Sequence, residues 1–261
     1  ACVLHRCMPM HELKLGFMPK ATQKNFARLQ DDPRMAGFTL VGGTALALHL
    51  GHRISEDLDF NLFGQKLPIQ AIDGLLDDLA AGGAAIQSLI TPEQKLGFKI
   101  NTAENLDHYI QDYLIDGAKV TFHSRHEGDR PKKQIEFLQS TPKVMVSKEG
   151  FDVMGMDGLM VMKSIVVYDR VKSRDIYDLM VLTRDHGYAL DDIFAAIDAY
   201  QPFRHKDPEH FKRVVCGAIA LDQDDEGFAS IRLNVKMSDV YRYFKNLIND
   251  HEIKMVQRLR P

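Results

Sequence analysis

The sequence has few of the features that mark several classes of protein. Its three cysteines, Cys2, Cys7 and Cys216, lack the spacing of metal ligands, which argues against a structural metal site and fits a reducing cytoplasm. No apolar run is long enough to span a membrane, and residues 1–8 hold too short an apolar stretch for a secretory signal. We therefore expect a cytoplasmic protein that has no membrane partner.

An excess of charge of one sign is also missing. The formal net charge of the 261 residues is −3, so any nucleic-acid-binding surface must be a local patch. Residues 119–133 and 227–261 are basic candidates for such a patch, but a solvated loop and an exposed helix explain them equally well. The contents of hydrophobic residues (45%) and charged residues (26%) are those of an ordinary globular protein.

Several common catalytic signatures are absent. The sequence contains no HExxH motif, no Walker GxxxxGK[ST] motif, and neither the HRD nor the DFG element of protein kinases. These absences argue against a kinase and against catalysis built on histidine. His49 and His52 flank a predicted helix, where they either touch a substrate or have a structural role.

What the sequence does contain is a glycine pair between a predicted strand and a predicted helix. Residues 38–41 are typical of a buried strand and residues 44–50 of a short apolar helix, with Gly42, Gly43 and Thr44 at the junction. Peptide N–H groups at a helix N-terminus suit a phosphate chain. A tight turn is the plainer interpretation of two adjacent glycines.

Two aspartates follow at a distance that lets the short helix return the chain to the same edge of a sheet. Residues 58–63 predict a second strand, and alternation places Asp57 and Asp59 on the same face of it. Such a pair of carboxylates holds a hard divalent cation, Mg²⁺ or Mn²⁺, although an isolated DxD is usually a solvated strand edge. With Arg53 and Ser55 just before the acids, the combination favours a metal-dependent site for a nucleoside triphosphate.

A second group of polar residues lies about a hundred residues further on. Lys163 is the single charge inside an apolar helix predicted over residues 157–168, so it either lines a polar cleft or extends to the surface. Asp175 and Asp178 lie three residues apart on one face of the next predicted helix, residues 173–186. Ser173 is a good N-cap, so Asp175 in the first turn also fits a helix-dipole role, which makes Asp178 the better functional candidate.

The order of predicted elements changes once along the chain. Helices over 22–29 and 69–80 alternate with the strands above, and extended stretches follow, with Asp116-Gly117 as a hairpin turn. After residue 151 the pattern is helical. We therefore predict an N-terminal extension (1–19), an α/β domain (20–150) and a helical C-terminal lobe (151–261), which together form an α+β fold. The extended stretches are predicted at 86–90, 97–102, 108–115, 119–123 and 134–138, and the later helices at 157–168, 173–186, 190–200, 208–221 and 238–258.

These motifs resemble a known family. The run from Gly42 to Leu46, followed by the run from Arg53 to Phe60, is similar to the nucleotidyltransferase family of AbiEii/AbiGii-type toxins, within the DNA polymerase β-like superfamily. Lys163 followed by the run from Arg174 to Asp178 resembles the family's lysine and RDxxD helix. The resemblance covers roughly residues 20–200 and implies a polymerase β-like mixed sheet with flanking helices, followed by a helical lobe.

The resemblance also implies roles and partners. Asp57, Asp59, Lys163 and Asp178 would be catalytic, with Arg174 and Asp175 as further candidates. The nucleotide would be bound by Gly42, Gly43, Thr44, Arg53 and Ser55. The expected reaction transfers a nucleoside monophosphate from an NTP to RNA, in particular a tRNA 3′ end, by a toxin with a separately encoded antitoxin. The alternative is a catalytically reduced nucleotide-binding or protein-binding module that retains the fold.

The sequence departs from the wider superfamily at one position. Polymerase β-like enzymes often carry a third metal-site carboxylate on a later strand, and here Thr121 occupies the expected place. Threonine does not replace a carboxylate ligand. Either Asp178 supplies the third acid or the site is weakened; Asp116 is a substitute in principle but is more simply a turn residue.

Overall fold

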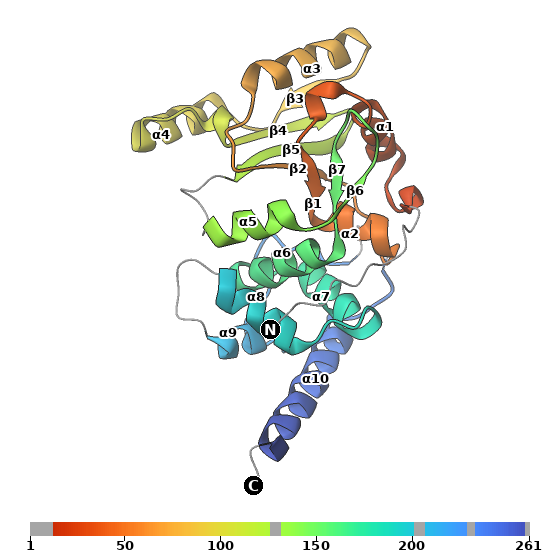
Figure 1. Ribbon diagram of the computed structural model, residues 1–261, viewed down its shortest axis with the longest axis vertical. Helices are drawn as coiled ribbons and strands as arrows, with labels where there is room; N and C mark the ends of the chain where they lie inside the picture. Colours follow the sequence, from red (N-terminus) through yellow and green to blue (C-terminus); the bar gives the residue numbers. More distant parts are fainter. Residues whose placement is uncertain (1–12, 126–131, 201–206, 229–232, 259–261) are drawn as a thin grey trace.

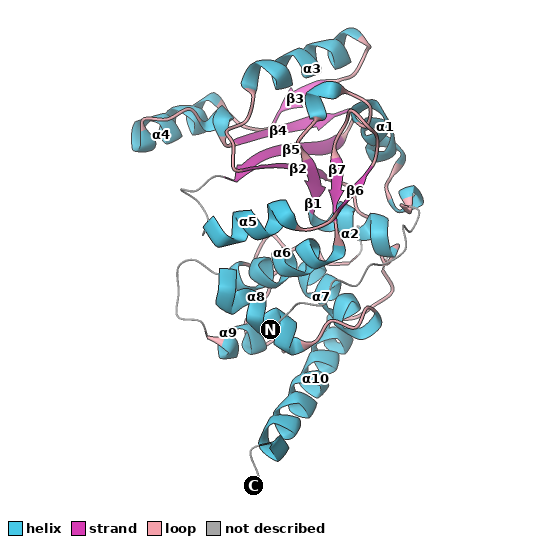
Figure 2. Ribbon diagram, in the orientation of Figure 1, coloured by secondary structure: helices cyan, strands magenta, loops and turns pink. Residues whose placement is uncertain are grey.

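The computed structural model describes residues 13–125, 132–200, 207–228 and 233–258, and shows a mixed sheet above a layer of helices (Figures 1 and 2). The sheet has seven strands in the order β3-β4-β5-β2-β1-β7-β6. The prediction of an α+β fold is confirmed. The strands are β1 (Thr39–Val41), β2 (Leu58–Phe63), β3 (Ile86–Ser88), β4 (Ile110–Ile115), β5 (Ala118–Arg125), β6 (Lys143–Met145) and β7 (Asp152–Met154).

Helices cover both faces of the sheet. Helices α1 and α3 lie on one face, whereas α2, α5 and α6 lie on the other, beside α7, α8 and α9; helix α4 lies at the edge of the sheet near β4 (Figure 1). Helix α10 extends away from the body to the C-terminus. The helices are α1 (Lys20–Leu29), α2 (Gly42–Leu50), α3 (Ile69–Ala81), α4 (Pro92–Thr102), α5 (Lys132–Ser140), α6 (Met156–Asp169), α7 (Ser173–Asp185), α8 (Leu190–Tyr200), α9 (Pro208–Val215) and α10 (Met237–Arg258).

The register of the central strands defines two chemically different faces. Strand β2 runs antiparallel to β1 and parallel to β5, and β4 runs antiparallel to β5. Asp59 is paired with Thr121, and Thr121 with Asp112. Paired residues share a face, so these three side chains form a row on what we call the acidic face. Phe60 and Phe122 lie on the opposite, aromatic face.

The aromatic face forms the centre of the hydrophobic core. Phe60 is fully buried and its ring lies 5.8 Å from that of Phe122 and 4.8 Å from that of Phe151. Phe26 of α1 closes the group at 5.1 Å from Phe151. The buried apolar residues continue without a break into the helical layer, and the predicted boundary at residue 150 falls between β6 and β7.

Two predicted extended stretches are wrong. Residues 97–102 belong to α4, which begins with a capping box between Thr91 and Gln94 and has Pro92 in its first turn. Residues 134–138 belong to α5, where Gln134, Ile135 and Leu138 are buried at helical spacing. Strands β6 and β7, of three residues each, are missing from the prediction.

Other local predictions are confirmed or shortened. Asp116 (φ 48°) and Gly117 (φ 84°) form the turn between β4 and β5, as predicted. The Asp116 carboxylate also accepts hydrogen bonds from Lys24 and Arg28 at 2.7 Å each. Helix α9 ends at Val215, before the predicted residue 221. No described helix is both long enough and apolar enough to cross a membrane.

The aromatic core yields a stability prediction. Phe60→Ala removes a fully buried ring and leaves a cavity, which should lower the free energy of unfolding by about 3–5 kcal/mol. Leu96→Ala on α4, where the side chain is 59% exposed, should change it by no more than about 0.5 kcal/mol. Urea unfolding measures both values, and equal effects of the two substitutions would contradict this account of the core.

Candidate functional site

The start of α2 is built so that side chains approach its backbone closely. Gly42 has a left-handed conformation (φ 73°), and a Cβ atom there would lie 2.6 Å from Asp59 Oδ2. A Cβ atom on Gly43 would lie 2.4 Å from Arg53 Nη2. A side chain at either position would therefore displace Asp59 or Arg53, and the positive φ of Gly42 also favours glycine. The first N–H groups of α2 still have no partners within the helix, as at every helix N-terminus.

Thr44 and Ser55 connect α2 to the loop before β2. Thr44 Oγ1 lies 2.8 Å from Ser55 Oγ and also hydrogen-bonds the carbonyl oxygen of Asp57. Ser55 donates its backbone N–H to Phe17 at 3.0 Å. Both side chains are buried, so the structure uses the two hydroxyls to hold Asp57 next to the helix.

Asp57 and Asp59 lie together at the beginning of β2 and are partly buried. Neither carboxylate accepts a hydrogen bond or forms an ion pair within the described ranges. Burial, followed by the charge of Asp57, raises the pKa of Asp59 to about 6, and burial also raises the pKa of Asp57. The site therefore holds two neighbouring negative charges whose cost is only partly offset by nearby cations.

Asp178 is fully buried and surrounded by cations. Its Oδ1 accepts hydrogen bonds from Arg53 Nε at 2.7 Å and His52 Nε2 at 2.8 Å, and its Oδ2 lies 2.9 Å from Arg53 Nη2 and 2.6 Å from Lys163 Nζ. Burial disfavours its ionisation, but Arg53 and Lys163 hold the pKa of Asp178 well below its usual range. Both carboxylate oxygens are thus occupied by protein groups, as is the Arg53 guanidinium.

Lys163 bridges two acids instead of extending to the surface. Its side chain is 7% exposed, and Nζ lies 2.6 Å from Asp175 Oδ1 as well as from Asp178. Asp175 also pairs with Arg170 at 2.8 Å. Burial opposes its charge, but the two aspartates raise the pKa of Lys163. The charge of Lys163 also opposes part of the rise in the pKa of Asp59. This buried network therefore lies close to the acidic face.

An acidic loop that sequence reasoning did not connect to the site covers the start of α7. Helix α7 begins at Ser173, so Ser173 is not its N-cap; instead Asp225 accepts hydrogen bonds from the Ser173 N–H and hydroxyl. Glu226 pairs with Arg174 at 3.0 Å. The charges of Arg174 and Glu226 both act on Asp57, which brings this loop into the electrostatic surroundings of the site.

The two histidines have structural partners. His49 Nε2 lies 2.9 Å from the carbonyl oxygen of Met154, which connects α2 to β7. His52 contacts Asp178 and stacks on Tyr177, with the ring centres 5.9 Å apart. No three His, Cys, Asp or Glu side chains among the described residues are gathered closely enough to form a complete metal centre.

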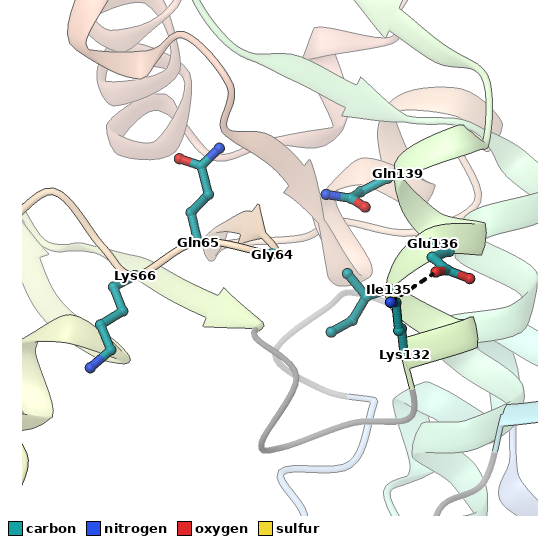
Figure 3. Close-up of a pocket in the computed structure, with 7 residues that line it drawn as sticks. All are labelled: Gly64, Gln65, Lys66, Lys132, Ile135, Glu136 and Gln139. Carbon is teal, nitrogen blue, oxygen red and sulfur yellow. Dashed lines mark ion pairs between the residues drawn. The ribbon is translucent and has the colours of Figure 1, made fainter.

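A polar cavity of about 490 Å³ lies at the other end of β2 (Figure 3). Gly64, Gln65 and Lys66 line one side, and α5 provides the other, where Lys132 lies 4.0 Å from Glu136. At about 3.3 Å per strand residue, Gly64 is roughly 16 Å from Asp59. This cavity contains none of the residues predicted to bind the nucleotide.

Comparison with known proteins decides the family. The sequence profile described as "Nucleotidyl transferase AbiEii toxin, Type IV TA system" matches residues 26–250, most of the chain. The chain belongs to this family. The predicted resemblance to this family is confirmed.

Individual relatives are distant. An uncharacterised protein of Aquifex aeolicus is 26% identical over 158 residues, which are 60% of this chain and 62% of that protein. JHP933 of Helicobacter pylori is similar in structure, with a TM-score of 0.46, 17% identity, and coverage of 90% of this chain and 96% of that one. The nucleotidyltransferase toxin MenT4 of Mycobacterium tuberculosis has a TM-score of 0.47, 14% identity, and coverage of 87% and 80%.

The buried network yields a stability prediction. Asp178→Asn leaves Arg53 and Lys163 as buried cations without their shared partner, which should cost about 3–5 kcal/mol of unfolding free energy. As a control, Asp224→Asn removes an 85% exposed carboxylate that pairs with Lys172 and should have no measurable effect. Chemical unfolding at pH 7 measures both variants, and a stable Asp178→Asn protein would contradict a structural role for the network.

Asp59 yields the opposite expectation. Its pKa is raised from 3.8 to about 6 in the folded protein, so its contribution to stability is fully present below pH 4 and is lost as pH rises through 6. Asp59→Asn removes this cost and should stabilise the protein at pH 7 by about 3 kcal/mol, but not at pH 4. Unfolding at both pH values, with Asp77→Asn on the exposed surface of α3 as control, measures the difference; no gain at pH 7 would refute the assignment.

Proposed function

We propose that this chain transfers a nucleoside monophosphate from an NTP to an RNA acceptor, with a tRNA 3′ end as the first candidate, in a reaction that requires Mg²⁺ or Mn²⁺. The observation that carries the proposal is the pair of Asp57 and Asp59, two partly buried carboxylates without hydrogen-bond partners in the described structure, beside the N-terminus of α2. AbiEii family membership supports the same class of reaction.

The acidic pair fits a divalent cation. Oxygen ligands from one or two carboxylates, completed by substrate phosphates and water, are typical of magnesium in proteins. The raised pKa of Asp59 shows that its charge is poorly compensated by the protein alone. Bound there, the cation would supply charge neutralisation at the triphosphate and a lower pKa for the attacking hydroxyl.

The residues of the chain provide positioning. The free N–H groups at the start of α2 would contact phosphate oxygens. Gly42 allows Asp59 to reach this helix start, and Thr44 and Ser55 fix the loop that carries Asp57. Arg53, Lys163 and Asp178 hold the helical layer against this loop, so we assign them to positioning of the site. Attack of the acceptor hydroxyl on the α-phosphorus releases pyrophosphate.

Family membership supports the proposed partner, and local charge supports the proposed acceptor. A type IV toxin has a separately encoded antitoxin, which we propose as the biological partner. Lys119, Lys132 and Lys133 belong to the basic stretch 119–133, of which residues 126–131 lie outside the described structure. Residues 229–232 and 259–261 of the second basic stretch also lie outside it. Such lysines would contact RNA phosphates without sequence preference.

Label transfer tests the proposed function. With α-³²P-labelled NTPs, Mg²⁺ and total tRNA, the wild-type protein should label RNA, and Asp59→Ala should reduce the rate by at least about 100-fold because it removes a cation ligand. A γ-labelled NTP should leave the RNA unlabelled, and Asp77→Ala should behave as wild type. Label from the γ position, or equal labelling by wild type and Asp59→Ala, would exclude a nucleotidyltransferase centred on Asp59; absence of labelling by both would favour a binding module.

A further inference from the structure

A row of polar groups continues from Asp59 across two more strands. Thr121 on β5 is paired with Asp59, and Asp112 on β4 is paired with Thr121, so all three side chains lie on the acidic face. The pairing between β4 and β5 is a local hairpin, whereas the pairing of β5 with β2 is remote in sequence: Asp112 is 53 residues from Asp59. No motif in the sequence connects them.

Two atoms in this row are buried without hydrogen-bond partners in the described structure. They are Thr121 Oγ1 and Asp112 Oδ1. The Thr121 residue is 2% exposed and therefore buried, whereas the Asp112 side chain is 17% exposed and lies at the boundary between solvent and interior. Leaving such polar groups unpaired costs free energy unless a ligand or water completes them.

The negative charge of this row is not balanced by nearby cations. Asp57 and Asp112 both act on Asp59: after burial, the charge of each carboxylate raises the pKa of Asp59. Lys119 lies 3.4 Å from Asp112. Of the cations near the acidic pair, it has the largest effect on the pKa of both Asp57 and Asp59. The other cations that act on the acidic pair already have their own acidic partners: Arg53, Lys163 and Arg174. Three carboxylates and one ammonium leave a charge of −2, which one divalent cation neutralises.

The distance between Asp59 and Asp112 decides whether Asp112 would contact the cation directly or through water. Neighbouring strands are about 4.8 Å apart, so the backbones of Asp59 and Asp112 are roughly 10 Å apart across β5. This separation is too large for a compact centre of three direct ligands, in agreement with the absence of one among the described side chains. Magnesium usually keeps several of its water molecules, and those waters extend its reach toward a more distant carboxylate.

We propose that the Asp112 carboxylate and the Thr121 hydroxyl bind the water shell of the divalent cation held by Asp57 and Asp59. The inference rests on the proposed function and adds two positioning residues to it. It also gives a role to Thr121, which stands where a third acid was expected and lies between Asp59 and Asp112 in the sheet.

Binding of Mn²⁺ alone, followed by the electron paramagnetic resonance signal of the free ion, tests the inference. Asp112→Asn should raise the dissociation constant by about tenfold or more, as loss of a carboxylate that orients metal ligands typically does. Asp77→Asn on α3 makes the same change of charge elsewhere and should bind as wild type. Asp112→Asn/Thr121→Asp, which returns a carboxylate one strand closer to Asp59, should regain the wild-type affinity.

The outcomes separate this inference from the proposed function. If Asp112→Asn binds Mn²⁺ within twofold of wild type while Asp59→Asn binds weakly, the role of Asp112 is refuted and the proposed function stands. If Asp59→Asn also binds as wild type, the cation site itself is refuted. A merely structural Asp112 would lower the melting temperature of the variant, and Thr121→Asp would not restore its Mn²⁺ affinity.

Discussion

The structure depends on one buried ionic network between the loop before β2 and helices α6 and α7. Arg53 and Lys163 meet on the carboxylate of Asp178, and Lys163 also meets Asp175. Each of these charges would be prohibitively costly in the interior alone, but together they satisfy one another. The network therefore fixes where the helical layer sits relative to the strand that carries Asp57 and Asp59.

The buried network and the acidic pair differ in how far protein partners satisfy their charges. The residues of the network are saturated by protein partners, whereas Asp57 and Asp59 have none among the described residues. A pair of neighbouring acids left without partners is destabilising in the free protein, as the raised pKa of Asp59 indicates. Under the proposed function a cation would relieve this cost on binding, so stability and function would oppose each other at Asp59 but not at Asp178.

The glycine pair shows how a motif and its structural cause differ. The sequence pattern favours a phosphate-binding turn at Gly42 and Gly43. The structure gives an additional reason for both glycines, because Asp59 and Arg53 occupy the space that a Cβ atom would need.

The predictions of extended structure for residues 97–102 and 134–138 were wrong because a short apolar pattern is ambiguous. Apolar spacing over five or six residues does not distinguish a strand from a helix, and the capping box at Thr91 and Gln94 decided the first case.

The sequence by itself determined the local chemistry: the shared face of Asp57 and Asp59, the hairpin at Asp116, and the family to which the motifs belong. These are properties of neighbouring residues, and backbone alternation and turn preferences act over that range. Only the tertiary structure decided that Arg53 pairs with Asp178, 125 residues away, and that Asp112 joins the row of Asp59. Strand order and register arise from packing of the whole core, and no short stretch of sequence contains that information.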